Sequence, residues 1–256
     1  MIVCKSPAEI ERMAAPNALV SRILSELGGL AAPGVTTRDL DVLAERRIRE
    51  AGALPAFKGY RGYPATLCAS VNDQVVHGIP SDRKLVEGDV LSLDLGAQMD
   101  GFFGDSAVTV AIGRVSEEAE RLLRVTEEAL GHAIAQVRVG GRVSDIGHAV
   151  QLLVEEHGFS VVREFVGHGI GAQMHEEPQI PNYGEPGRGP RLAEGMVLAI
   201  EPMVNAGKPG VKILADGWTA VTKDGSLSAH FEHTVAVTAR GPRVLTARNG
   251  APGQDA

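Results

Sequence analysis

Apolar residues recur at helical spacing in four stretches of the chain, and residues typical of helix ends bound these stretches. The first stretch follows Ser6, which can cap a helix, with Pro7 suited to its first turn and Glu9 completing a capping box. Gly52 and Gly158 end the second and fourth stretches, because glycine readily adopts the left-handed conformation beyond a helix. The pattern predicts one helix after Ser6 and three more over residues 37–51, 117–136 and 144–157.

Strand-like alternation of apolar and polar residues separates the second helix from the third. A segment with glycines and prolines, residues 57–80, leads into it, and residues 90–113 hold two alternating runs joined by a turn. Two helices followed by strands then occur a second time along the chain, which suggests an internal repeat.

The repeat is supported at two independent places. Glycines bracket the second and the fourth helix with the same separation, 106 residues apart, and residues 87–94 resemble residues 194–201 at a distance of 107 residues. We therefore predict an α+β fold with two pseudo-symmetric αβ halves, whose helices pack over a shared, mainly antiparallel sheet. Residues 1–256 would form a single domain with halves at about 6–113 and 116–248, and a site is expected between the halves.

Composition and charge argue against several classes of protein. The chain has 25 Lys and Arg against 32 Asp and Glu, a net charge of −7, and no basic stripe suited to a phosphate backbone. Cys4 and Cys68 are too few for a disulfide framework or a thiolate zinc site. The sequence has neither the pattern of a signal peptide nor an apolar run of membrane-spanning length. We expect a cytoplasmic protein that binds neither nucleic acid nor a membrane.

The two alternating runs are typical of a hairpin that carries a pair of aspartates. A turn centred on residues 99–100 places Asp94 directly opposite Asp105, whereas a turn at residues 100–101 makes them diagonal neighbours on one face. Since neighbouring carboxylates repel, either register favours a bound cation.

Two further carboxylates join this pair through the repeat. It aligns Glu201 with Asp94 and, after a longer turn, Glu232 with Asp105. The glycine-rich run at residues 167–171 can bring its histidine close to the same place. Four carboxylates and one histidine suit two divalent ions such as Mn, Fe or Co, and two-metal sites activate water and polarise a carbonyl or phosphoryl group.

Each of these residues also has an ordinary structural explanation. An aspartate near a turn is more often a turn residue than a ligand, and a glycine-rich run is more often a loop. The aromatic residues Phe57, Tyr60 and Tyr63 can line a pocket or only plug a loop, and Trp218 can be a packed ring. The other histidines have no informative spacing: we assign His132, His148 and His157 to helices and leave His230 and His233 open.

Several motifs taken together resemble the type I methionine aminopeptidases of the pita-bread fold. They are, in chain order, SVNDQVVHGIP, LDLG, GFFGDS, GHGIGAQMHEEPQIPNYG, LAIEP and DGWTAVTKDGSLSAHFEHTVAVT, so the resemblance covers nearly the whole chain. It implies metal-dependent removal of the N-terminal methionine from nascent or newly made polypeptides, with a preference for a small second residue.

The resemblance also implies roles for individual residues. Two divalent ions (Co, Mn, Fe or similar) would be bound by Asp94, Asp105, His168, Glu201 and Glu232, of which Asp105 and Glu232 bridge. Catalysis would use His77, His175 and Glu201, with the histidines touching the substrate and the tetrahedral centre and the glutamate moving the proton. Besides these two histidines, the substrate would contact Tyr60, Tyr63, Cys68, Met174 and Trp218. One monovalent cation, Na or K, would be bound by Asn72 and Ser228.

The chain departs from the family pattern in a few places. Met174 stands where an aromatic residue is expected, which predicts a softer pocket wall and a shifted residue preference. The stretch from His77 to Asp94 is about one residue shorter than usual, and the segment from Glu201 to Glu232 has no room for the helical insertion of type II enzymes.

Two alternatives remain beside this hypothesis. An aminopeptidase P or prolidase usually carries a large N-terminal domain that 256 residues cannot hold, and a non-catalytic pita-bread binding protein would have a broken ligand set. We expect a monomer that acts on polypeptide N-termini, with transient ribosome association as an option and no separate docking or zinc module before the first helix.

Overall fold

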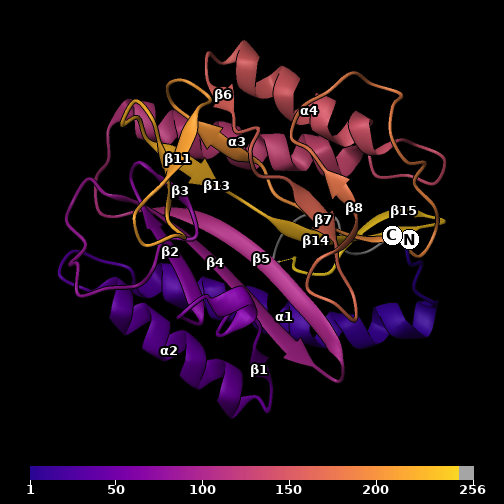
Figure 1. Cartoon of the computed structure of the whole chain (residues 1–256), viewed down its shortest axis with the longest axis horizontal. Helices are drawn as coiled ribbons and strands as arrows, with labels where there is room; N and C mark the ends of the chain where they lie inside the picture. The colour runs from indigo at the N-terminus through magenta and orange to yellow at the C-terminus, as the bar shows by residue number, and fades with distance from the viewer. Residues whose placement is uncertain (248–256) are drawn as a thin grey trace.

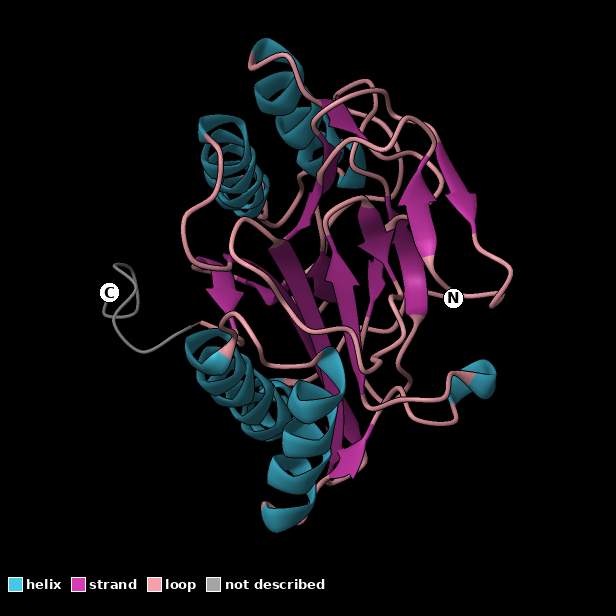
Figure 2. Cartoon of the chain, turned by 90° about the vertical axis from the view of Figure 1, so that its left-hand side faces the viewer, coloured by secondary structure: helices cyan, strands magenta, loops and turns pink. Residues whose placement is uncertain are grey.

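The four α-helices of residues 1–247, the part of the chain that the computed structural model describes, form two pairs. One pair lies at the top of the molecule and the other at the bottom in both views (Figure 1, Figure 2). The fourth helix begins and ends 106 residues after the second, which is the repeat distance of the bracketing glycines. Residue 248, the last of the predicted second half, lies outside the described residues. The helices are α1 (Pro7–Leu30), α2 (Thr37–Glu50), α3 (Glu117–Ala135) and α4 (Val143–Glu156).

Capping interactions explain where the helices begin. In front of α1, the hydroxyl of Ser6 accepts a hydrogen bond from the backbone N–H of Glu9, whose carboxylate accepts one from the Ser6 N–H. The predicted capping box is therefore confirmed. Helix α4 begins at Val143, one residue earlier than predicted, because the Asp145 carboxylate accepts the backbone N–H of Arg142 at 2.8 Å. Within residues 1–247, no helix is both long and apolar enough to cross a bilayer.

All strand pairs in the described residues are antiparallel, but they form four sheets instead of the single shared sheet that we predicted. The first sheet contains β1 (Leu54–Pro55), β2 (Leu67–Val71), β4 (Val90–Met99) and β5 (Phe102–Ala111). The second contains β6 (Ser160–Val161), β10 (Met203–Asn205) and β13 (Ser228–His230). The third contains β3 (Gln74–Val76), β11 (Val211–Ile213) and β12 (Ala220–Thr222). The fourth contains β7 (Gly167–Gly169), β8 (Glu176–Ile180), β9 (Val197–Ile200), β14 (His233–Thr238) and β15 (Gly241–Val244).

The two halves meet along a seam between β5 and the strands β13 and β14. A single bridge joins Ala107 to Glu232, with the Glu232 N–H donating to the Ala107 carbonyl at 3.0 Å. Hydroxyl groups cross the seam in both directions: Ser106 donates to the Glu232 carbonyl at 2.7 Å, and Thr234 donates to the Asp105 carbonyl at 2.8 Å. The halves are thus joined directly at residues that the sequence assigned to a site.

Helix α1 lies unusually close to the strand that carries one of these residues. A side chain at Gly104 in β5 would meet the backbone of Pro16 and Asn17 at under 3.0 Å. Only glycine fits at this approach, which brings the middle of α1 onto β5 next to Asp105. The apolar face of α1 is buried there against β4 and β5, so the core supports the site directly.

Candidate metal centre

The first aspartate pair is set by the hairpin of β4 and β5. Asp94 pairs with Ala107, and Asp105 pairs with Gly96, so the two aspartates are diagonal neighbours on one face. This is the second of the two predicted registers. The turn consists of residues 100–101, both with positive φ (50° and 80°), as in the type I′ turns that Asp-Gly favours.

The glutamates lie where the corresponding strands of the second half are interrupted. Glu201 follows the end of β9, and Glu232 lies between β13 and β14. Since Ile200 pairs with His233, the two glutamates face each other across the end of this ladder. Four carboxylates from both halves therefore reach the seam.

The pairing register corrects one detail of the predicted repeat. Asp105 pairs with Gly96, two residues after the first aspartate. The corresponding residue of the second half, Met203, pairs with His230 and not with Glu232. The predicted alignment of Glu232 with Asp105 was therefore wrong by two positions, and the residue at the place of Asp105 is His230. Glu232 still reaches the site because it occupies the next residue position on that face of the strand.

His168 in β7 completes the cluster. Its Nδ1 donates to the carbonyl of Gly169 at 2.9 Å, which leaves Nε2 without a proton and able to act as a ligand. Nε2 lies 3.8 Å from Oδ2 of Asp105 and 3.7 Å from Oε1 of Glu201. One potential ligand atom from each of Asp105, His168 and Glu232 lies within 4.8 Å of the others, and all three residues are buried.

The electrostatics of the metal-free cluster are those of a cation site. Oxygens of Asp94, Asp105 and Glu232 are buried without a hydrogen-bond partner. Burial raises the pKa of Asp94 to about 7 and that of Glu201 to about 8, and burial together with the neighbouring carboxylates raises the pKa of Asp105 and Glu232. Burial also lowers the pKa of His168 to about 3, so its imidazole is neutral. Oxygen atoms with one neutral imidazole nitrogen suit hard or borderline divalent ions, so the residues present fit the predicted metal site.

The predicted auxiliary histidine His175 lies beside this cluster at its exposed edge. Its ring centroid is 4.2 Å from that of His168, and its Nδ1 is 2.9 Å from the hydroxyl of Tyr60, on whose ring it stacks. Burial, followed by the charge of Arg61, lowers its pKa. Tyr60, predicted to line the pocket, thus holds the histidine in place.

His77, the other auxiliary histidine, lies among aromatic rings. It makes edge contacts with Phe165 at 5.4 Å and with Trp218 at 6.3 Å between ring centroids. Burial lowers its pKa to about 4, so the ring is uncharged at neutral pH. Its backbone has a positive φ of 60°.

An apolar cluster adjoins this ring and includes three of the predicted pocket residues. Tyr63 and Trp218 meet edge to face at 5.2 Å, and Cys68 pairs with Asp94 in the sheet, so the cluster borders the carboxylates. Burial raises the pKa of both Tyr63 and Cys68. Met174 is buried next to His175 but lies outside this cluster. The cluster consists of Phe57, Tyr63, Ala65, Cys68, Ile79 and Trp218.

The predicted monovalent-cation residues are adjacent in the structure. The Ser228 N–H donates to the Asn72 carbonyl at 2.9 Å. Both side chains already have partners: Oδ1 of Asn72 accepts the Val90 N–H, and the Ser228 hydroxyl contacts Oδ1 of Asn205.

A pocket of about 640 Å³ opens at the exposed edge of the cluster, lined by both His168 and His175. The start of the chain contributes to its wall, and Lys5 holds that segment through a buried ion pair with Glu176 at 2.5 Å. The pocket connects the candidate centre to solvent on the side of Arg61. A peptide could reach the centre by this route.

Comparison with known proteins agrees with this geometry. The model of metallopeptidase family M24 matches residues 11–239. The chain belongs to metallopeptidase family M24. A relative from Bacillus subtilis named methionine aminopeptidase 1 is 52% identical over 96% of this chain and 99% of its own length. The crystal structure of a methionine aminopeptidase from Thermotoga maritima superposes with a TM-score of 0.95 at 47% identity, covering 97% of this chain and 100% of that one.

More distant solved structures share the fold. A prolidase from Pyrococcus horikoshii superposes with a TM-score of 0.76 at 23% identity, and the match covers 96% of this chain but 64% of the prolidase. The predicted pita-bread architecture and the predicted resemblance to type I methionine aminopeptidases are therefore confirmed. The segment between Glu201 and Glu232 contains only the short strands β10 to β13, without a helix. An M24 metallopeptidase is a hydrolase that uses divalent metal ions.

Sequence reasoning missed two residues that the structure places at the site. His230 had no informative spacing to the predicted ligands, although it lies two residues before Glu232 and strand periodicity puts both on one face. Phe165 packs against His77 from a loop, and no local pattern identifies such a contact.

Proposed function

We propose that this protein removes the N-terminal methionine from polypeptides, using divalent metal ions. The observation that carries the proposal is the group of Asp105, Glu232 and the neutral Nε2 of His168, with Glu201 3.7 Å from that nitrogen. An apolar cluster that includes Trp218 lies beside it. Relatives that carry the name methionine aminopeptidase are about half identical over nearly the whole chain. The proline-specific relatives share only the fold.

Two divalent ions would be held by the five predicted ligands, with Asp105 and Glu232 between them. Such ions lower the pKa of water and polarise a peptide carbonyl. Carboxylate-rich sites accept several divalent metals, so Co, Mn and Fe are all candidates and availability decides among them. The ligands are Asp94, Asp105, His168, Glu201 and Glu232.

The chain's own groups supply the remaining chemistry. Glu201 would accept and return a proton, since one of its carboxylate oxygens lies toward His168 and the other toward His230. His175 donates a hydrogen bond to the tetrahedral centre from its exposed edge, with its ring held by Tyr60. His77, uncharged and enclosed by aromatic rings, orients the scissile peptide by hydrogen bonding.

The apolar cluster would accept the methionine side chain. Tyr63, Cys68 and Trp218 form an apolar surface beside Asp94 that suits an unbranched thioether and disfavours charge. Met174 adds flexibility near His175, so we expect some cleavage after norleucine or leucine. A small second residue fits best because the space next to His77 is already filled by Phe165.

Other features of the proposal rest on the sequence. One Na or K ion would be held by carbonyl oxygens at Asn72 and Ser228. The protein would act as a cytoplasmic monomer of one domain on nascent or newly made chains, with transient contact with the ribosome. Sedimentation, for example, would test whether the protein is a monomer.

The decisive experiment combines metal analysis with a peptide panel. Protein purified without added metal is analysed for bound metal and then assayed on Met-Ala-Ser, Met-Leu-Ser and Ala-Pro-Ser, with Mn²⁺, Co²⁺ or Fe²⁺ and with a chelator. We expect metal-dependent cleavage of Met-Ala-Ser at least 10-fold above the other two peptides, a ratio of the size that pocket fit supplies. Preferred cleavage of Ala-Pro-Ser would instead favour an aminopeptidase P activity.

A further inference from the structure

His230 lies against the carboxylate cluster without a function assigned to it. It is the last residue of β13 and is 1% exposed. Its Nε2 has no hydrogen-bond partner and lies 3.6 Å from Oε2 of Glu201. A buried ring nitrogen without a partner is unfavourable, and it calls for an explanation.

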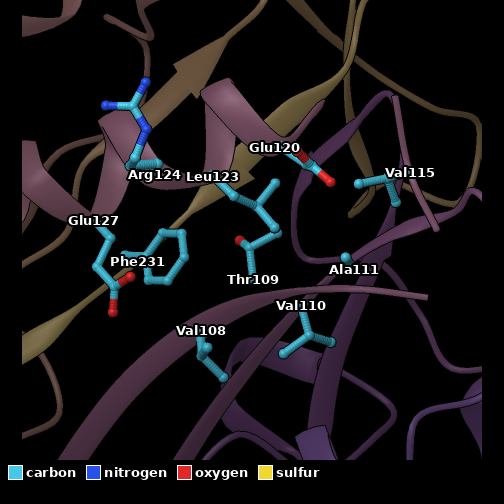
Figure 3. A pocket seen from close by; sticks show the side chains of 10 residues that line it. All are labelled: Val108, Thr109, Val110, Ala111, Val115, Glu120, Leu123, Arg124, Glu127 and Phe231. Atoms are coloured by element: carbon cyan, nitrogen blue, oxygen red, sulfur yellow. The ribbon is translucent and has the colours of Figure 1, made fainter. Parts of the chain in front are cut away.

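The fold itself directs this side chain to the cluster. His230 pairs with Met203 in the same register in which Asp105 pairs with Gly96. In the second half, His230 therefore takes the strand position that Asp105, a predicted metal ligand, has in the first half. Phe231, the next residue, points to the opposite face, where it lines a pocket between β5 and α3 (Figure 3).

The backbone of His230 is fixed by Thr109, which lines the same pocket (Figure 3). The Thr109 hydroxyl accepts the His230 N–H at 2.9 Å and donates to the His230 carbonyl at 2.7 Å. The hydroxyl oxygen of Ser92 lies 2.8 Å from the hydroxyl oxygen of Thr109. Because these bonds come from the protein, the position of His230 is set before any ion binds.

The geometry makes His230 a partner of Glu201 and not a further ligand. Within 4.0 Å, the Nε2 of His230 meets one carboxylate among the described residues, that of Glu201. The Glu201 carboxylate lies between two imidazoles, with Oε1 near His168 and Oε2 near His230. If an ion takes Oε1, the other oxygen is free to accept a hydrogen bond from the side of His230.

We propose that His230 is a positioning residue for Glu201, donating a hydrogen bond from Nε2 to Oε2 and so fixing the carboxylate that binds metal and moves the proton. This inference rests on the proposed function. Groups that orient a metal ligand in this way change metal affinity or activity by about 10- to 100-fold when they are removed.

The test compares two substitutions of different chemistry. His230→Leu removes the donor, whereas His230→Gln keeps an N–H donor on a flexible chain. His132→Leu, at an exposed position of α3, is the control. Metal-free protein is titrated with Co²⁺ by calorimetry, and kcat and KM are measured on Met-Ala-Ser. The visible spectrum of the Co²⁺ form and the Tm of the metal-free form are recorded for each variant.

We expect His230→Leu to weaken Co²⁺ binding and to lower kcat by about 10- to 100-fold with little change in KM. His230→Gln should recover most of both losses and keep the wild-type Co²⁺ spectrum, and Tm of the metal-free variants should stay within a few degrees. Unchanged Co²⁺ affinity and kcat in His230→Leu would overturn the proposal. A changed spectrum in His230→Gln would also overturn it, because it would make His230 a ligand.

A double substitution keeps the test informative if His230→Leu is unstable. In a Glu201→Gln background the carboxylate is absent, so adding His230→Gln or His230→Leu should change Co²⁺ affinity by less than about twofold. A full additional loss in that background would contradict the proposed contact. Failure of the wild-type protein to bind Co²⁺ or to cleave Met-Ala-Ser would refute the proposed function instead, so the two failures are distinguishable.

Discussion

The long ladders of the two halves share one strand register but place their carboxylates differently. In the first half, β4 and β5 pair without a break over ten residues each. In the second half, the same register runs through β9 with β14 and β10 with β13, but breaks at residues 201–202 and 231–232. Pro202 has no N–H to donate, so one hydrogen bond of the ladder is missing directly after Glu201.

This difference explains the choice of side chains. Aspartates in an unbroken ladder keep regular strand geometry and become diagonal neighbours on one face. Their short side chains are therefore long enough to reach the common centre. Glutamates at a break leave the ladder and face each other across its end, and their longer side chains reach the common centre. The halves are therefore equivalent in topology but not in ligand geometry.

The largest effect should follow from removing one predicted bridging carboxylate from either half. Asp105→Ala and Glu232→Ala should each lose at least one metal equivalent and lower kcat/KM by more than about 10²-fold, since even partners of ligands are worth 10- to 100-fold. Elemental analysis and steady-state kinetics measure both effects. Glu127→Gln, at an exposed position of α3, is the control. Near-normal turnover in either variant would refute a centre shared between the halves.

The sequence was sufficient to predict most of the helices but only part of the strand arrangement. Helix ends depend on local groups such as Ser6 and Glu9, whose capping box is visible in a few residues. The division into four sheets depends on contacts between residues far apart in the chain. For the hairpin, the Asp-Gly pair at residues 100–101 favours the observed turn, and this signal would have decided between the two registers.

The candidate site, too, was predicted only where its residues follow a pattern within the sequence. Its carboxylates were predicted because they recur at similar places in both halves. His230 was left open because it has no informative spacing to the predicted ligands, and only the strand register shows that it is the counterpart of Asp105. Contacts across the seam, such as Thr234 to the Asp105 carbonyl, leave no local pattern in the sequence.

The next largest effect concerns His175, which belongs to neither ladder. His175→Ala should lower kcat by about 10²- to 10³-fold with metal content unchanged, because the residue donates to the reacting centre without binding an ion. Tyr60→Phe removes the hydroxyl that holds the ring of His175, and it should lower kcat by a smaller factor. Metal analysis, kcat and Tm distinguish the roles. Loss of metal along with activity in His175→Ala would instead make it part of the ligand set.

A pH-dependent effect of intermediate size should distinguish metal-free from metal-loaded protein. The folded metal-free form keeps protons on Asp94 and Glu201, with pKa values of about 7 and 8, whereas the unfolded chain releases them near pH 4. Folding then binds protons, so stability is highest at low pH and falls as the pH rises from about 4 to 8. We expect Tm in chelator to fall by several degrees between pH 5 and 8.

Metal loading should remove this fall, because bound ions keep the carboxylates ionised. Asp94→Asn in the first half and Glu201→Gln in the second should each flatten the metal-free slope, by similar amounts if the halves contribute equally. Thermal scans at several pH values provide the measurement. A metal-free Tm that rises over the same range would mean that the carboxylates are ionised without metal.

The smallest effect tests how far the unbroken ladder depends on its turn. Gly101 has a positive φ of 80° and open space around its Cα, so Gly101→Ala adds backbone strain without a clash. The substitution should destabilise the protein by about 1 kcal/mol and lower Tm by about 2–4 °C.

Gly29→Ala is a matched control, since Gly29 lies in the last turn of α1 with open space and no positive φ, and there alanine should raise Tm slightly. Metal content and kcat should not change in either variant, because the buried faces of β4 and β5 fix the register. If Gly101→Ala also loses metal, the turn and not the packed ladder positions Asp94 and Asp105, and the contrast between the two halves would lie in their connections.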